Sequence, residues 1–132
     1  MGRALDMSQQ SIERIAEKDR DGWLALFADD AVIEDPVGPS MFDKSGAGHR
    51  GKDAIANFYD TTISMSEKVT ITIDHSIECG DEVARVGEIS ITLPGGQVGL
   101  VTCVNIYKVG ADGKLVSLRS FWDQDSLEFT VT

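Results

Sequence analysis

The chain has 132 residues, of which 42% are hydrophobic and 26% charged, and this composition is typical of one globular domain with its own core. With 12 basic and 22 acidic residues its net charge is −10, which argues against nucleic acids and anionic membrane surfaces as partners. Cys79 and Cys103 have neither a C-x-x-C spacing nor histidines beside them, so we expect no metal site and no cofactor. We expect a single domain over residues 1–132, flexible over 1–7, in a cytoplasmic protein.

The first elements are predicted to be helices. Ser8 can cap a helix in which Ile12 and Ile15 recur at helical spacing, and this helix should end around residues 18–20. Asp21 can cap a second, short helix with the sequence DGWLALFA.

A strand, a loop and a third helix follow. AVIEDP, residues 31–36, is typical of a short strand, and residues 37–51 are rich in Gly, Pro and Ser without an apolar period, which indicates a loop. The helix KDAIANFYDTTI then places Ile55, Phe58 and Tyr59 on one face.

The second half of the chain is predicted to be strands. Four β-rich segments, at about 69–79, 82–93, 97–109 and 114–122, are separated by the turn signals CGD, PGG and GADG. They should form an antiparallel meander. Helices followed by strands indicate an α+β fold.

The segment QVGLVTCVNIYKV has apolar residues on both faces. Val101, Cys103 and Tyr107 alternate with Leu100, Val104 and Ile106. One face should pack on the helices, and the other is most simply covered by a second copy of the chain. We therefore expect a homodimer.

The loop GAGHRGKD contains two phosphate-binding patterns in weak form. Gly46, Gly48 and Gly51 match G-x-G-x-x-G, and Gly46 to Lys52 match G-x-x-x-x-G-K. Asp53 occupies the Ser or Thr position, and no buried strand precedes the glycines, so the context of a phosphate loop is missing. A lid or a plain loop is favoured.

Other candidate groups lack partners. His75 shares its predicted strand face with three isoleucines, which favours a core or interface histidine, and His49 in the glycine loop should be solvated. Ser11, Ser40 and Ser120 have no G-x-S-x-G motif around them, so the sequence does not support a serine nucleophile.

Asp35 lies at the end of the predicted strand, on the face shared by Ala31 and Ile33. Pro36 should keep Asp35 extended and end the strand. Two interpretations remain open: the carboxylate projects into partly apolar surroundings at the rim of the sheet, or it caps a turn.

The segments LFADDAVIEDPVG, GKDAIANFYD and DGKLVSLRSFW together resemble the ketosteroid isomerase (steroid Δ-isomerase) family, over most of the chain. Within it, GWLAL, IEDP and the tryptophan of the last strand most resemble the actinobacterial isomerase-like proteins. The resemblance implies the NTF2-like or SnoaL-like fold, a cone-shaped barrel in which three helices cover a curved antiparallel sheet around an apolar pocket, and dimers formed through the outer sheet face.

The resemblance also implies roles for individual residues. Asp35 matches the general base, the Asp of the family's E-D-P motif. The family's two oxyanion-hole donors, a tyrosine and a protonated aspartate, are replaced by Ser11 and Asn105, and loss of one such donor typically costs about 2.7 to 4 kcal/mol. Tyr59 and Trp122 match other aromatic positions, and either one is a candidate replacement donor.

We therefore expect a weakly active isomerase of a steroid-like ketone, in which Asp35, Tyr59 and Asn105 act in catalysis. The expected ligand-binding residues are Ser11, Ile15, Val37, Phe58, Val101, Cys103, Ser120 and Trp122.

Three alternatives belong to other classes. One is a binder of hydrophobic molecules without turnover, and another is a different acid-base enzyme of the fold, such as a polyketide cyclase or an epoxide hydrolase. For the latter, Arg14, Arg85 and Arg119 are the arginines to locate. A pure interaction module has the least support, because it needs no aspartate in its pocket.

Overall fold

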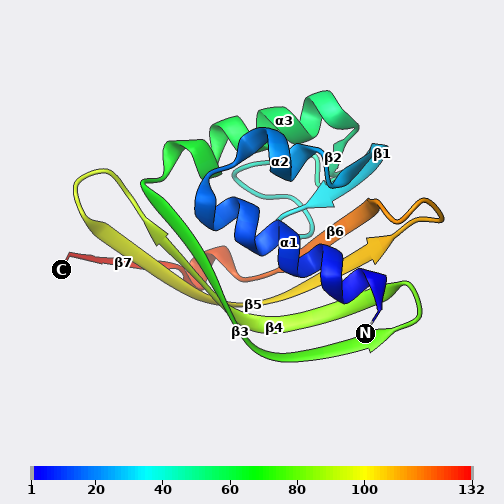
Figure 1. The fold of residues 1–132 in the computed structure, drawn as a ribbon. Coiled ribbons are helices and arrows are strands. Elements are labelled where there is room, and N and C mark those ends of the chain that lie inside the picture. Colours follow the sequence, from blue (N-terminus) through cyan, green and yellow to red (C-terminus); the bar gives the residue numbers. More distant parts are fainter. Residues whose placement is uncertain (1, 132) are drawn as a thin grey trace.

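The computed structural model describes residues 2–131, and in it three α-helices cover one face of a strongly curved sheet (Figure 1). The α+β prediction is confirmed. The sheet wraps around α1 as a cone, but the described strands do not close into a barrel.

The N-cap of helix α1 (Arg3–Glu17) is Gly2, six residues before the predicted cap. Ser8 is therefore not its cap but an interior residue, whose hydroxyl donates to the Leu5 carbonyl (2.8 Å). The segment expected to be flexible is helical from Arg3 onward, because Glu78 of a distant strand accepts hydrogen bonds from the backbone N–H groups of Gly2 and Leu5 (3.0 Å each).

Helix α2 (Arg20–Leu24) is capped by Asp19 rather than by the predicted Asp21, since the Asp19 carboxylate accepts from the Gly22 N–H (3.0 Å). The third helix, α3 (Lys52–Thr61), agrees closely with the prediction. A 3-10 turn, η1 (Ile63–Met65), continues it to the edge of the sheet.

The strands are β1 (Phe27–Glu34), β2 (His49–Arg50), β3 (Lys68–Cys79), β4 (Glu82–Thr92), β5 (Gln97–Val109), β6 (Leu115–Phe121) and β7 (Glu128–Val131). Strands β3 to β6 form the predicted antiparallel meander. The sheet order is β2-β1-β6-β5-β4-β3, with β7 pairing with the beginning of β5. The sequence analysis did not predict β2 or β7.

The pairing of β1 with β6 is parallel, so the sheet is mixed rather than wholly antiparallel. The two strands are far apart in the sequence. Nothing in the local sequence of either strand indicates whether they pair parallel or antiparallel. Parallel pairing brings the carboxyl ends of β1 and β6 to the same edge of the sheet (Figure 1).

The core lies between the helices and the concave face of the sheet. Trp23 of α2, Phe27 of β1 and Leu115 of β6 are at most 1% exposed, and the rings of Trp23 and Phe27 meet edge to face with centroids 4.8 Å apart. The alternation predicted for β5 is confirmed on this side, since Val101, Cys103 and Tyr107 are all buried.

The alternate residues of β5 lie on the convex face of the sheet. Leu100 is 48% exposed, and Val104 and Ile106 are partly buried. His75 was predicted on a face with Ile71 and Ile73, but the register of β3 shifts between Ile73 and His75. This bulge turns His75 to the other side of the sheet, where it is exposed.

The helices described here include none that is both long and apolar enough to cross a membrane.

Candidate functional site

Asp35 directly follows β1 and lies beside the end of β6. In the parallel register Glu34 is opposite Arg119, and the Val37 N–H donates to the Ser120 carbonyl (2.9 Å). The peptide bond between Asp35 and Pro36 is cis. The chain therefore leaves β1 next to Ser120 and Trp122.

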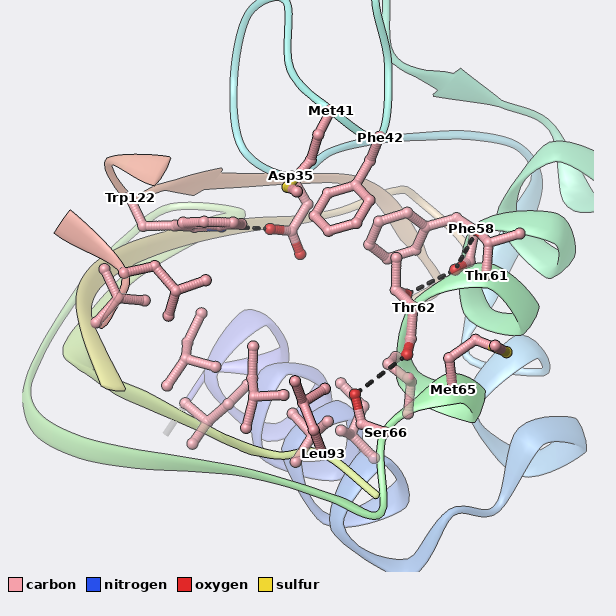
Figure 2. A pocket seen from close by; sticks show the side chains of 18 of the residues that line it. Asp35, Met41, Phe42, Phe58, Thr61, Thr62, Met65, Ser66, Leu93 and Trp122 are labelled. Carbon is pink, nitrogen blue, oxygen red and sulfur yellow. Dashed lines mark hydrogen bonds between the residues drawn. The ribbon is translucent and has the colours of Figure 1, made fainter. Parts of the chain in front are cut away.

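The Asp35 carboxylate faces a cavity of about 270 Å³ between the helices and the sheet (Figure 2). Trp122 lies beside it, and Phe42 and Met41 of the long loop are close by (Figure 2). The cavity is mainly apolar and is lined by Ile15, Trp23, Asp35, Met41, Phe42, Phe58, Thr61, Thr62, Ile63, Met65, Ser66, Val69, Ile71, Ile89, Ile91, Leu93, Val101, Leu118, Trp122, Leu127 and Phe129.

The surroundings of Asp35 raise its pKa from 3.8 to about 6, mainly because burial disfavours the charged carboxylate. The side-chain hydrogen bond from Trp122 acts in the opposite direction. The indole Nε1–H of Trp122 donates to Asp35 Oδ1 at 2.6 Å. Asp35 keeps some accessible surface because it faces the cavity, while protein atoms surround it on the other sides.

Replacing Trp122 by Phe should raise the pKa of Asp35 by about one unit, because the charged form loses a hydrogen-bond donor worth about 1.5 kcal/mol. The measurement is the pH dependence of the Asp35 carboxyl carbon shift by NMR. Trp23→Phe is the matched control, since it removes an indole N–H from the same cavity wall but one that donates to Ser11 (3.1 Å). An unchanged or lowered pKa in Trp122→Phe would contradict the assigned hydrogen bond.

A buried polar group lies behind Asp35. The Ser120 hydroxyl donates to Asn105 Oδ1 at 2.5 Å, and both residues are at most 3% exposed. Tyr107 is buried nearby, and its pKa is raised chiefly by burial and next by the Asp35 charge. Neither Asn105 nor Ser120 is among the cavity-lining residues.

Tyr59 and Ser11 also lie outside the cavity. The ring of Tyr59 packs against Trp23, with centroids 5.3 Å apart, and is 2% exposed. Burial raises the pKa of Tyr59, and the charge of Asp19 adds to this effect. The hydroxyl of Ser11 is the acceptor for the Trp23 indole.

The structure thus brings together part of the predicted site. Asp35, Ile15, Phe58, Val101 and Trp122 all line one cavity. The remaining predicted residues, Tyr59, Asn105, Ser11, Val37, Cys103 and Ser120, are not among its lining residues. Cys103 is buried within β5, and burial raises the pKa of its thiol to about 11.

Part of the glycine loop forms the short strand β2. Its His49 was expected to be solvated but is partly buried in β2, where its ring lies 4.8 Å from that of Phe58. Burial lowers the pKa of His49, which favours the neutral imidazole, while the nearby Asp43 opposes this effect. Met41 and Phe42, which precede the glycines in the loop at 37–51, form part of the cavity wall.

The three arginines named above lie elsewhere. Arg119 pairs with Glu34 at 2.7 Å on the convex face, and Arg14 pairs with Glu17 and Asp19. Arg85 is 6% exposed beneath α1, and its guanidinium donates to the Ser8 hydroxyl at 2.6 Å. The cavity lining therefore contains one carboxylate and no arginine, and no cluster of metal-binding side chains occurs among residues 2–131.

Every side-chain N–H and O–H on the cavity wall already has an acceptor. The two indoles donate to Ser11 and Asp35, and the hydroxyls of Thr61, Thr62 and Ser66 donate to backbone carbonyls. The described wall therefore offers no free side-chain donor to a ligand oxygen.

The sequence analysis missed the wall formed by Thr62 and Ser66. Phe58, Thr62 and Ser66 are spaced by four residues, so they continue the inner face of α3 past its end. That spacing was visible in the sequence, but the polar character of Thr62 and Ser66 hid them from a search for apolar periodicity.

Comparison with known proteins places this geometry in a family. The SnoaL-like domain family matches residues 9–118. A Delta 5-3-ketosteroid isomerase from Mycobacterium sp. is 36% identical and superposes with a TM-score of 0.93, covering 98% of this chain and all of that one. RV0760c from Mycobacterium tuberculosis, solved in complex with estradiol-17beta-hemisuccinate, is also 36% identical, with a TM-score of 0.92 and the same coverage.

A steroid Delta-isomerase from Nocardioides simplex is 29% identical over 98 residues, which are 74% of this chain and 72% of that protein. The match to the SnoaL-like domain spans most of the chain, and the superpositions extend over nearly all of it. The chain therefore belongs to the SnoaL-like domain family, in the group that includes the ketosteroid isomerases.

Proposed function

We propose that this protein binds a steroid-like ketone and moves a β,γ double bond into conjugation with the carbonyl, with Asp35 as the general base. The observation that carries the proposal is a carboxylate with a pKa of about 6 facing an apolar cavity. Near neutral pH such a group is mostly ionised and accepts a proton, and its acid form readily returns it.

The reaction needs no group beyond the substrate and one carboxylate. Asp35 removes a proton from the carbon between the carbonyl and the double bond, and the electron pair of that C–H bond moves to give a dienolate. The protonated Asp35 then delivers the same proton to the far carbon of the original double bond. The carbonyl re-forms, and the net change is the position of one double bond and one hydrogen.

Stabilisation of the negative charge on the dienolate oxygen should be the weak part of this catalysis. No lining side chain has an N–H or O–H free to stabilise its negative charge. Because each missing donor costs roughly a hundred- to thousandfold in rate, turnover should be well below that of an enzyme with a complete oxyanion hole.

The relatives support the ligand class. Two of them carry the isomerase activity in their names, and a third was solved with a steroid ester. The test is to add a β,γ-unsaturated 3-oxosteroid and follow the absorbance of the conjugated enone. No rate above that of buffer would remove the proposed activity.

A second candidate is a protein that binds hydrophobic ligands without turnover. The specific observation in its favour is that every lining donor is already engaged. Saturable binding of a 3-oxosteroid with no enone formation would support this candidate against the first.

Other acid-base reactions of the fold, such as polyketide cyclisation, remain alternatives that use the same carboxylate. Epoxide opening of the kind that uses an aspartate-arginine-aspartate set gains no support from the described cavity, whose lining has a single carboxylate and no arginine.

We also propose that the protein is a homodimer formed through its convex sheet face. Apolar side chains on that face keep much of their surface in the single chain, among them Ile77, Leu100 and Phe121, which are 59%, 48% and 39% exposed. Sedimentation should give about twice the 14.3 kDa of one chain. Leu100→Asp should shift this mass toward the monomer, and Asn57→Asp, an exposed change on the helical side, should leave it unchanged.

We place the protein in the cytoplasm, because the thiol of Cys79 is exposed and unpaired and such thiols persist best in a reducing compartment.

A further inference from the structure

The side of the cavity away from Asp35 carries its remaining polar groups (Figure 2). Thr62 follows the last turn of α3, and Ser66 follows η1. Thr62 Oγ1 donates to the Phe58 carbonyl at 2.6 Å, and Ser66 Oγ donates to the Thr62 carbonyl at 3.3 Å.

The direction of these hydrogen bonds is fixed by their acceptors. A backbone carbonyl can only accept a hydrogen bond, so each hydroxyl donates its single hydrogen to that carbonyl. Each hydroxyl oxygen then has only its lone pairs available, so it can accept a hydrogen bond from a ligand but not donate one. Their neighbours on the wall, such as Ile63 and Leu93, are apolar and offer no donor.

An acceptor without a partner in an apolar cavity lowers the affinity for any ligand that does not supply a hydrogen. A ligand hydroxyl at this place donates to Thr62 or Ser66. A ligand ketone at the same place brings further lone pairs against those of the wall and gains no hydrogen bond.

We propose that Thr62 and Ser66 form a subsite that selects ligands with a hydroxyl, or another hydrogen-bond donor, at the end remote from the ketone held near Asp35. This inference rests on the proposed function, since it takes that function's ligand and its orientation as given. It adds a requirement for the end of the ligand remote from the ketone, which must carry a hydrogen-bond donor.

The test compares two ligands that differ only at the remote oxygen. In 17β-hydroxyandrost-4-en-3-one that oxygen is a hydroxyl, and in androst-4-ene-3,17-dione it is a ketone. Both are already conjugated, so neither is turned over and both give equilibrium dissociation constants by calorimetry. The wild-type protein should bind the hydroxyl ligand about fivefold more tightly, as one neutral hydrogen bond predicts.

The double variant Thr62→Val, Ser66→Ala should bring this affinity ratio close to one. Ser64→Ala is the matched control, because Ser64 lies on the same 3-10 turn but is exposed and outside the cavity lining. It should leave the ratio unchanged. The readout is a ratio measured on one protein, so a variant that is partly unfolded lowers both affinities and not their quotient.

Two results would overturn the subsite. One is equal binding of both ligands by the wild-type protein, which leaves the proposed function standing because both ligands still bind. The other is a preference for the hydroxyl that persists in the double variant. If neither ligand binds, the subsite and the proposed steroid ligand fall together.

Discussion

Replacing Asp35 by Asn is expected to lower the rate of double-bond isomerisation by about a thousandfold, the typical contribution of a positioned general base. The amide has nearly the shape of the carboxylate and still accepts the Trp122 N–H, but it does not take a proton from carbon. The measurement is enone formation from a β,γ-unsaturated 3-oxosteroid at saturating concentration, together with the dissociation constant of a conjugated product.

The matched control is Glu34→Gln. It makes the same chemical change one residue earlier, on a side chain that pairs with Arg119 on the convex face rather than facing the cavity. Its rate should stay within a few fold of the wild-type rate. Equal rates for Asp35→Asn and the wild type would show that Asp35 takes no part in the chemistry, even if both proteins bind the steroid.

The same Asp35→Asn change is expected to increase the free energy of unfolding by up to about 3 kcal/mol at pH 8. The pKa of Asp35 rises from 3.8 to about 6 on folding, and each unit corresponds to about 1.36 kcal/mol. Because the pKa of Asp35 is higher in the folded protein than in the unfolded chain, the charged carboxylate lowers the free energy of unfolding above pH 6. This cost declines as the pH falls from about 6 toward 3.8, where the folded and unfolded chains both bind the proton.

Urea unfolding of both proteins at several pH values measures this effect. The stability gain of Asp35→Asn should be largest above pH 7, should shrink between about pH 6 and 4, and should be lost below pH 4. Glu34→Gln should change stability by about 1 kcal/mol or less at any of these pH values, since exposed ion pairs contribute little. An Asp35→Asn protein that is no more stable than the wild type at pH 8 would contradict a desolvated carboxylate.

Taken together, the two expected results describe a residue kept for activity at the expense of stability. A buried carboxylate is costly unless it is paired with a cation, and the described cavity lining supplies no cation. Trp122 offsets part of this cost through its hydrogen bond. Such a balance keeps the pKa near neutral, where proton transfer to and from carbon is most effective.

The sequence by itself determined the features that depend on local order. Alternation along AVIED placed Asp35 with Ala31 and Ile33, and both of these are fully buried in the structure. Helical spacing placed Phe58 on the inner face of α3, where it lines the cavity. Each of these inferences needs only the repeat of apolar residues along one strand or one helix. That repeat is visible in the residues of the element itself.

The tertiary structure decided which polar groups meet. Asn105 was a candidate donor to the ligand, but it is buried within the sheet outside the cavity lining, where its Oδ1 accepts from Ser120 of the neighbouring strand. The bulge in β3 reversed the side of His75. Parallel pairing of β1 with β6 brought Trp122 to Asp35, although 87 residues separate them in the chain. A hydrogen-bond partner is chosen by strand register and packing over such distances, and no local pattern in the sequence encodes that choice.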